Sequence, residues 1–132
     1  MRWRLVDLTE PGKPAKPRNK LHAEPTEIDG IRFASKKEAL RYSELKIMHA
    51  AGEIGPIELQ PKFPLGTDGA PVLIKSKGYP NGRRAAYYAD FRYYDKIKGA
   101  IVVEDTKGYD TALSRLKRAI VEAQYKIEVV VL

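Results

Sequence analysis

The sequence lacks cysteine altogether, and its 132 residues include only two histidines, His22 and His49. Without cysteine there is no disulfide framework and no thiolate metal site. Two histidines are too few for a zinc site built from Cys and His, and they leave few candidates for a Ser-His-Asp triad. A chain of this length can nevertheless bury about two-thirds of the surface of its unfolded state, so it can fold without a cross-link.

Long apolar runs are also missing. No segment approaches the roughly 20 residues that a membrane-spanning helix needs, and the N-terminus lacks the apolar core of a signal peptide. We therefore expect a soluble, cytoplasmic protein without a membrane partner. Lys and Arg number 24 against 17 Asp and Glu, which gives a formal charge of +7 and favours a polyanionic partner.

Residues 1–26 differ in composition from the rest of the chain. Proline and basic residues alternate there, and few apolar side chains are available for burial. We predict a basic, Pro-rich N-terminal arm over 1–26, extended or poorly ordered, followed by one domain over 27–132. Two interpretations of the arm stay open, a solubilising leader and a contact with the DNA backbone.

Hydrophobic spacing and turn residues predict an α/β protein. Asp29-Gly30 between apolar residues indicates a tight hairpin, and Ser35 begins a helix with the capping-box spacing to Glu38. The further predicted elements are strands at 57–65, 72–74 and 84–94, a turn at 78–82, a buried strand from 100, a helix from 111 to about 124 and a buried strand at 127–132. Pro61 and Pro64 restrict the first of these strands to an edge or irregular position. The apolar side of this second helix is formed by Leu113, Leu116, Ile120 and Ala123. A strand, a crossover helix and a final strand imply one parallel pairing at the end of a mixed sheet.

Two acids and a lysine follow the apolar run of the predicted central strand. Side chains alternate along a strand, so Asp105 and Lys107 share one face. Glu104 and Thr106 share the other. Asp90 interrupts the aromatic run of the preceding strand, and a hairpin between the two strands can place it beside Asp105. Two adjacent carboxylates repel each other unless a cation or a proton lies between them, and hard oxygen ligands suit Mg²⁺; the alternative is an ordinary Asp–Lys ion pair.

Glu38 is a third acidic candidate, on the first predicted helix. A helical wheel places it near Tyr42 and Leu45, whereas Glu44 points away from that group. The alternative is a purely structural role, because an acid at the third helical position completes a capping box with Ser35. The spacing by itself leaves both roles open.

An acid on an early helix, an Asp on one strand and an acid-x-Lys on the next resemble the arrangement of the PD-(D/E)XK nuclease superfamily. Within it, the chain looks like a group of small endonucleases predicted in phages and similar to Holliday-junction resolvases. The resemblance covers about residues 26–132 and is carried by Glu27-Ile28-Asp29-Gly30-Ile31-Arg32-Phe33, Ser35-Lys36-Lys37-Glu38-Ala39, Leu59-Gln60-Pro61-Lys62-Phe63, Tyr88-Ala89-Asp90-Phe91, Val103-Glu104-Asp105-Thr106-Lys107-Gly108 and the tail Thr111 to Tyr125. Ala89 replaces the motif proline, as it does in many members. Glu104 competes with Asp105, but only Asp105 has the two-residue offset to Lys107.

The resemblance implies a restriction-endonuclease-like αβββαβ core, in which helices flank a mixed sheet. It implies a Mg²⁺-dependent deoxyribonuclease, an endonuclease that hydrolyses phosphodiester bonds, with Mn²⁺ as a substitute metal. Asp90, Asp105 and the backbone carbonyl of Thr106 would hold the metal. Lys107 would orient the attacking water or stabilise the transition state. Glu38, as the helix acid, would bind a second metal or position its water.

Branched DNA such as a Holliday junction is the favoured substrate, because a small domain without a visible recognition module suits DNA shape over sequence. A restriction-like or nicking nuclease is the second candidate. Resolution of a junction needs two symmetric nicks and hence a homodimer. The resemblance also implies a phage or prophage protein in the cytoplasm of a bacterial host cell. A non-catalytic nucleic-acid-binding phage protein is the alternative from another class.

Two groups of basic residues are predicted to bind DNA. The first precedes the Asp90 strand and consists of Lys75, Lys77, Arg83 and Arg84; the second lies on the second helix and consists of Arg115, Lys117 and Arg118. The alternative for each is a solvated charged surface. Four tyrosines could stack on unpaired bases, namely Tyr87, Tyr88, Tyr93 and Tyr94. Packing within the sheet is the commoner role of such residues.

Overall fold

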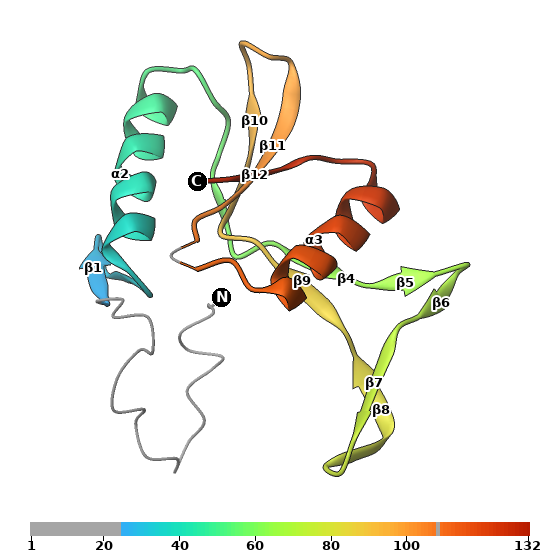
Figure 1. Ribbon diagram of the computed structural model, residues 1–132. Helices are drawn as coiled ribbons and strands as arrows, with labels where there is room; N and C mark the ends of the chain where they lie inside the picture. Colours follow the sequence, from blue (N-terminus) through green and yellow to red (C-terminus); the bar gives the residue numbers. More distant parts are fainter. Residues whose placement is uncertain (1–24, 108) are drawn as a thin grey trace.

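A four-stranded sheet lies at the centre of the computed structural model, which describes residues 25–107 and 109–132 (Figure 1). All but the last two residues of the predicted arm therefore lie outside the described residues. The strands of the sheet, in spatial order, are β12 (Val129–Val131), β11 (Ala100–Asp105), β10 (Phe91–Asp95) and β3 (Glu58–Leu59). β10 is antiparallel to β11 and β3, whereas β11 and β12 are parallel. The prediction of an α/β fold with one parallel pair at the end of a mixed sheet is confirmed.

Two helices accompany the sheet, and both begin at the caps that the sequence predicts. α2 (Lys36–Ala50) follows Ser35, whose Oγ accepts a hydrogen bond from the Glu38 N–H at 3.1 Å. α3 (Ala112–Tyr125) follows Thr111, whose Oγ1 accepts from the Ser114 N–H at 3.0 Å. Within the described part of the chain, no helix is long and apolar enough to cross a membrane.

Two hydrophobic clusters cover the two faces of the sheet. Val102 of β11 packs in the same cluster as Leu45 of α2, and Val103 packs in the same cluster as Val121 of α3. Because successive residues of a strand point to opposite faces, β11 supplies both clusters. The same alternation separates Glu104 from Asp105 at the end of this strand.

Four two-stranded sheets surround the main one. They are β1 (Thr26–Ile28) with β2 (Ile31–Phe33), β4 (Lys62–Pro64) with β9 (Ala86–Tyr88), β5 (Gly66–Thr67) with β6 (Ala70–Pro71), and β7 (Leu73–Ser76) with β8 (Tyr79–Arg84), all antiparallel. The first is the hairpin predicted at Asp29-Gly30, where both residues have the positive φ that a tight two-residue turn requires.

The two long strands predicted at 57–65 and 84–94 are each broken, and the breaks face each other. The first break lies at Gln60 and Pro61, between β3 and β4, and the second includes Asp90, between β9 and β10. The Gln60 N–H donates to the Asp90 carbonyl at 3.0 Å across the gap. Gln60 has a left-handed φ of 55°, and Pro61 has no N–H to donate to a strand ladder. Both segments therefore leave the main sheet here and pair with each other as β4 and β9.

Three other expectations are wrong in detail. The turn predicted at 78–82 is shorter, because β8 already begins at Tyr79 and a proline is tolerated in such an edge strand. The final strand is only partly buried, because β12 lies at the edge of the sheet and Val129 alone of its residues is buried. On α3, Leu113 and Leu116 are exposed, since the helix packs through the side that holds Val121.

Candidate active site

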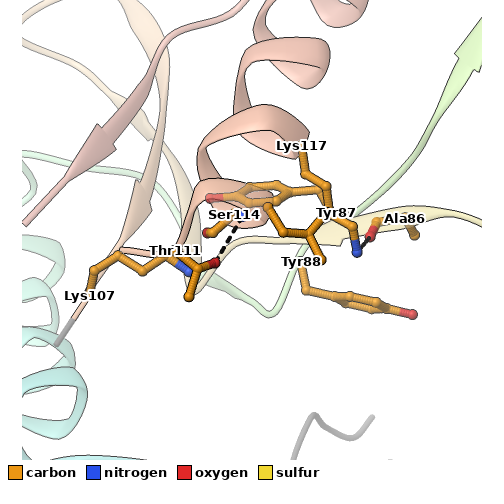
Figure 2. Close-up of a pocket in the computed structure, with 8 residues that line it drawn as sticks. Ala86, Tyr87, Tyr88, Lys107, Thr111, Ser114 and Lys117 are labelled. Carbon is orange, nitrogen blue, oxygen red and sulfur yellow. Dashed lines mark hydrogen bonds between the residues drawn. The ribbon is translucent and has the colours of Figure 1, made fainter. Parts of the chain in front are cut away.

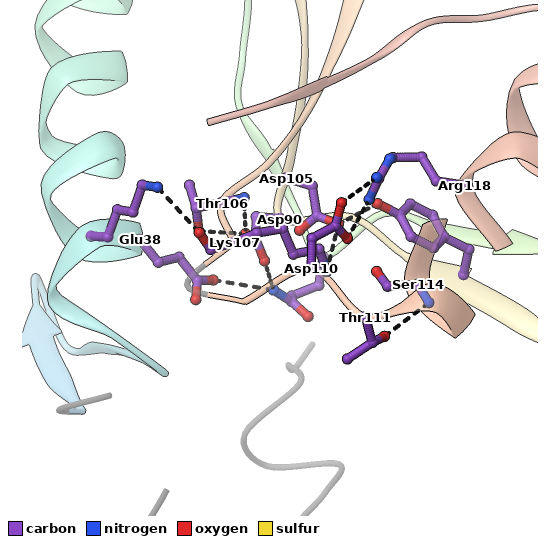
Figure 3. A network of polar contacts seen from close by, with 12 residues as sticks. Glu38, Asp90, Asp105, Thr106, Lys107, Asp110, Thr111, Ser114 and Arg118 are labelled. Atoms are coloured by element: carbon purple, nitrogen blue, oxygen red, sulfur yellow. Dashed lines mark hydrogen bonds and ion pairs between the residues drawn. The ribbon is translucent and has the colours of Figure 1, made fainter. Parts of the chain in front are cut away.

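Three carboxylates and one ammonium group lie together where β9, β10 and β11 meet the first turn of α2 (Figure 3). Phe91 pairs with Glu104 in the β10–β11 ladder, and the Asp90 N–H donates to the Glu104 carbonyl at 3.0 Å, which sets Asp90 across from Asp105. The side chains of Glu38, Asp90 and Asp105 are all buried. Acids in such surroundings are costly unless they are hydrogen-bonded or paired.

Asp90 is held by the residue that follows β11. The backbone N–H and the Oγ1 hydroxyl of Thr106 both donate to Asp90 Oδ2, each at 2.7 Å. This double contact fixes the Asp90 carboxylate relative to the acid-x-Lys segment, because its donor is the residue between Asp105 and Lys107. The hydroxyl contact is an addition to the carbonyl role that the resemblance implies for Thr106.

The surroundings of Asp105 favour the protonated form of its carboxyl group. Burial, followed by the negative charge of Asp90, raises its pKa from 3.8 to about 6. The Tyr87 hydroxyl donates to Asp105 Oδ2, and Lys107 Nζ lies 3.0 Å from the same oxygen, and both contacts oppose that rise. Burial and the hydrogen bond to Asp105 raise the pKa of Tyr87 in turn, so the phenol stays protonated as a donor.

Glu38 reaches the site through an amide. Gln60 Nε2 lies 3.3 Å from Glu38 Oε2 and 3.5 Å from Asp90 Oδ1, so one side chain bridges the helix acid and the strand acid. Gln60 Oε1 is buried and has no hydrogen-bond partner, the one such side-chain atom in the described residues. The Ser35 cap uses the backbone of Glu38, so its side chain can serve the site at the same time.

Glu104 lies on the opposite face from Asp105, as strand alternation predicts. Arg41 Nε and Nη2 donate to its two carboxylate oxygens at 2.8 and 2.7 Å, and the Tyr93 hydroxyl donates to Oε2. The hydrogen bond to Glu104 raises the pKa of Arg41. This buried, fully paired carboxylate joins α2 to β11 and is not part of the Asp90–Asp105 cluster.

Lys37 contacts the far side of the acid-x-Lys segment, which the sequence does not indicate. Its Nζ donates to the carbonyl of Lys107 at 3.2 Å and to the carbonyl of Leu132 at 2.6 Å. The first turn of α2 is thereby joined to the residues that directly follow β11 and β12. Together with Thr106, Tyr87 and Gln60, this lysine belongs to a set of supporting contacts that depend on tertiary structure.

The cations predicted on α3 have partners within the protein. Arg118 pairs with Asp110 through two contacts, at 3.1 and 2.6 Å, and this hydrogen bonding raises its pKa. Arg115 Nη1 donates to the Asp110 carbonyl at 2.6 Å, and Lys117 Nζ donates to the Ala86 carbonyl at 3.3 Å. The three side chains keep their positive charges on the first half of α3, but these contacts hold them in place.

A shallow pocket of about 260 Å³ lies beside Lys107, between β9 and the first turns of α3 (Figure 2). It is lined by Ala86, Tyr87, Tyr88, Lys107, Thr111, Leu113, Ser114 and Lys117. Of the four tyrosines considered for stacking, Tyr87 and Tyr93 are buried and hydrogen-bonded to acids, whereas Tyr88 and Tyr94 are about half exposed.

The carboxylates of the site are ligands that suit a hard divalent cation, although there are few of them. Within residues 25–107 and 109–132, no three His, Cys, Asp or Glu side chains are grouped so that they could hold a metal ion. Asp90 and Asp105 supply two carboxylates. Burial, and then the charge of Asp90, raise the pKa of Asp105, and a cation between the two groups would stabilise the ionised form. The remaining ligands would have to be main-chain carbonyls and water, as Mg²⁺ commonly accepts.

Comparison with known proteins places the chain in one family. Residues 18–130 match the family model described as "Protein of unknown function (DUF1064)", and the chain belongs to this family. Comparisons with curated proteins and with solved structures gave no significant match.

Proposed function

We propose that this protein is a metal-dependent DNA endonuclease of the PD-(D/E)XK type. The observation that carries the proposal is the pairing of two buried carboxylates, Asp90 and Asp105, with Lys107 Nζ 3.0 Å from Asp105. A phosphate-binding surface alone would gain nothing from buried acids, which repel the DNA backbone. A metal-dependent nuclease needs them as ligands.

The order of the elements supports the same proposal. Helix α2 precedes the strand that starts with β3, the broken strand that contains Asp90, and β11, and then α3 and β12 follow. With the small hairpins between β3 and β9 set aside, this order agrees with the αβββαβ core that the resemblance implies and so supports the proposal. The sheet order β12-β11-β10-β3 brings the ends of β10 and β11 together, which is where the candidate acids lie.

In the proposed reaction Asp90, Asp105 and the carbonyl of Thr106 would hold Mg²⁺, for which Mn²⁺ could substitute. When bound, the metal would supply an activated water and charge neutralisation at the phosphate. Thr106 and Tyr87 keep the two carboxylates in place by hydrogen bonds. The Lys107 ammonium, held by Asp105, would orient the attacking water or stabilise negative charge on the phosphate oxygens.

Glu38 has a less direct place in this scheme. Its carboxylate is separated from Asp90 by the bridging amide of Gln60. In the proposal it positions a water molecule or holds a second metal. Branched DNA remains the first substrate to test, with restriction-like cutting or nicking second, and a homodimer would provide the paired nicks of junction resolution.

The experiment that tests the proposal compares four substrates with the full-length protein. Supercoiled plasmid, linear duplex, a flap and a four-way junction are incubated with Mg²⁺ or with EDTA, next to an Asp90→Asn control. We expect Mg²⁺-dependent products that the control does not form. Binding to all four substrates with no cleavage under any metal condition would instead favour the non-catalytic binding protein.

A further inference from the structure

The β7–β8 hairpin is an isolated basic ribbon. Its two strands pair only with each other, and Figure 1 shows it extending away from the main sheet. Every residue of both strands is exposed except Gly82, which is partly buried. Lys75, Lys77 and Arg83 lie on it, and the sequence has no acidic residue between Asp68 and Asp90.

The base of the hairpin is firmly attached to the body of the protein. The Val72 N–H donates to the Leu65 carbonyl at 3.0 Å, and the Ala85 N–H donates to the Val72 carbonyl at 2.9 Å. Arg84 Nε also donates to the Leu65 carbonyl at 2.9 Å. A lone two-stranded hairpin is only marginally stable. These contacts at its base stabilise it and fix its direction relative to the rest of the protein. Arg84 is therefore an anchor of the ribbon and is not among its free cations.

The ribbon has a built-in bend. The register between its strands shifts between Ile74 and Ser76, and Gly82, with a φ of 90°, faces this shift. A Cβ at Gly82 would lie 2.8 Å from Leu73 Cβ, so only glycine permits the two strands to approach so closely. A bulge of this kind increases the local twist of a hairpin. A twisted two-stranded ribbon is a shape that the major groove of DNA admits.

The exposed side chains of the ribbon combine positive charge with apolar surface. Leu73, Ile74 and Tyr79 are each nearly half exposed. The Arg83 guanidinium lies 5.1 Å from the centre of the Tyr79 ring. A second copy of the chain would place like charges against each other on this surface, whereas a duplex would neutralise them.

The ribbon is also directly connected to the candidate active site. β8 continues through β9 to Asp90, so Arg83 is seven residues away from that acid. At about 3.3 Å per residue, Arg83 lies within roughly 23 Å of Asp90 and the turn at Gly78 within roughly 40 Å. One turn of DNA is about 34 Å long, so the ribbon can reach a groove no further than about one turn from a bond held at the site.

We propose that the β7–β8 hairpin is an arm that lies in the groove of a duplex flanking the cleaved bond. This inference rests on the proposed function and deepens it, because it names the substrate class as DNA with a double-stranded segment beside the cut. Lys75, Lys77 and Arg83 contact the phosphates of that segment.

The test measures binding separately from cleavage. In an Asp90→Asn background without metal, fluorescence anisotropy follows the affinity for a labelled 30-base-pair duplex and for a single strand of equal length, across a salt series. The variant Lys75→Ala/Lys77→Ala is compared with Lys96→Ala/Lys98→Ala, which removes the same charge from the turn at the other end of β10. Equal melting temperatures of the two variants show that both are folded.

The slope of log affinity against log salt is negative. We expect it to become shallower by about two for the hairpin variant on the duplex, and to change by less than about half a unit for the control. Equal slopes in the two variants, or an equal loss on duplex and single strand, would overturn the proposal. A change of molecular mass in sedimentation with an unchanged duplex slope would assign the surface to a second copy instead. Because the measurement uses no metal and no cleavage, its result does not depend on nuclease activity. Failure of the hairpin proposal is therefore distinguishable from failure of the proposed function.

Discussion

Glu104 and Asp105 are neighbours in the chain but belong to different structures. Arg41 and Tyr93 hold Glu104 on the face of β11 that α2 covers, whereas Tyr87 and Lys107 hold Asp105 on the other face. The pleat of the strand separates two buried carboxylates and gives them different surroundings. One is a fully paired structural acid, and the other has a raised pKa beside Asp90.

The first prediction concerns the two candidate metal ligands. Asp90→Asn and Asp105→Asn should each reduce cleavage at least about 100-fold, because each removes one of two carboxylates from the proposed metal site. DNA binding should be kept or tightened, since a negative charge near the phosphates is lost. The measurement is a cleavage time course beside an anisotropy titration. Asp68→Asn, on an exposed turn, is the matched control and should change neither.

The second prediction concerns the pH dependence of stability. The folded-state pKa of Asp105 lies near 6, above its ordinary 3.8, so folding favours the protonated form. The stabilising contribution is fully present below about pH 4 and is lost as pH rises through 6, a change of about 3 kcal/mol for a shift of this size. Urea unfolding in EDTA should show this loss in the wild type relative to Asp105→Asn.

A second variant checks the cause of that pH dependence. Tyr87→Phe removes a hydroxyl whose hydrogen bond lowers the pKa of Asp105. The pH midpoint of the effect should therefore move upward in this variant. A midpoint that stays in place, or moves downward, would show that the phenol does not stabilise the ionised acid.

The third prediction concerns the Arg41–Glu104 pair. Arg41→Ala should lower the free energy of unfolding by about 3–5 kcal/mol, because it leaves a buried carboxylate without its cation. Arg92→Ala breaks an ion pair with Glu58 that is much more exposed, and it should cost no more than about 1 kcal/mol. Chemical denaturation of both variants at pH 7 provides the comparison. Similar losses in the two would mean that Glu104 finds another partner or becomes protonated.

The fourth prediction concerns Gln60. Its amide bridges Glu38 and Asp90, while its backbone has a φ of 55° that suits glycine better. In Gln60→Gly the relief of backbone strain offsets the loss of two long hydrogen bonds to buried acids, so folding stability should change by no more than about 1 kcal/mol. Mn²⁺ binding should weaken by about 10-fold or more, as is typical when a residue that orients metal ligands is removed. Calorimetric titration of the DNA-free protein measures the affinity. Unchanged Mn²⁺ affinity would make the bridge irrelevant to the cation.

The sequence by itself determined the local elements and the sides of the strands. Ser35 and Thr111 cap helices because their hydroxyls satisfy free N–H groups of the first turn, and Asp29-Gly30 turns a hairpin because both residues tolerate positive φ. The alternation of side chains sufficed to separate Glu104 from Asp105. These are effects of neighbours within a few residues, which spacing alone reveals.

Only the tertiary structure decided which breaks in the strands face each other and what holds the acids. Pro61 indicates the first break locally, but Gln60 and Asp90 are 30 positions apart, and the facing break at Asp90 depends on pairing between distant segments. The same applies to the contacts of Tyr87 and Thr106 and to the exposure of Leu113 on α3. Periodicity shows that a helix has an apolar side, but the packing of that helix against the sheet decides which residues are buried.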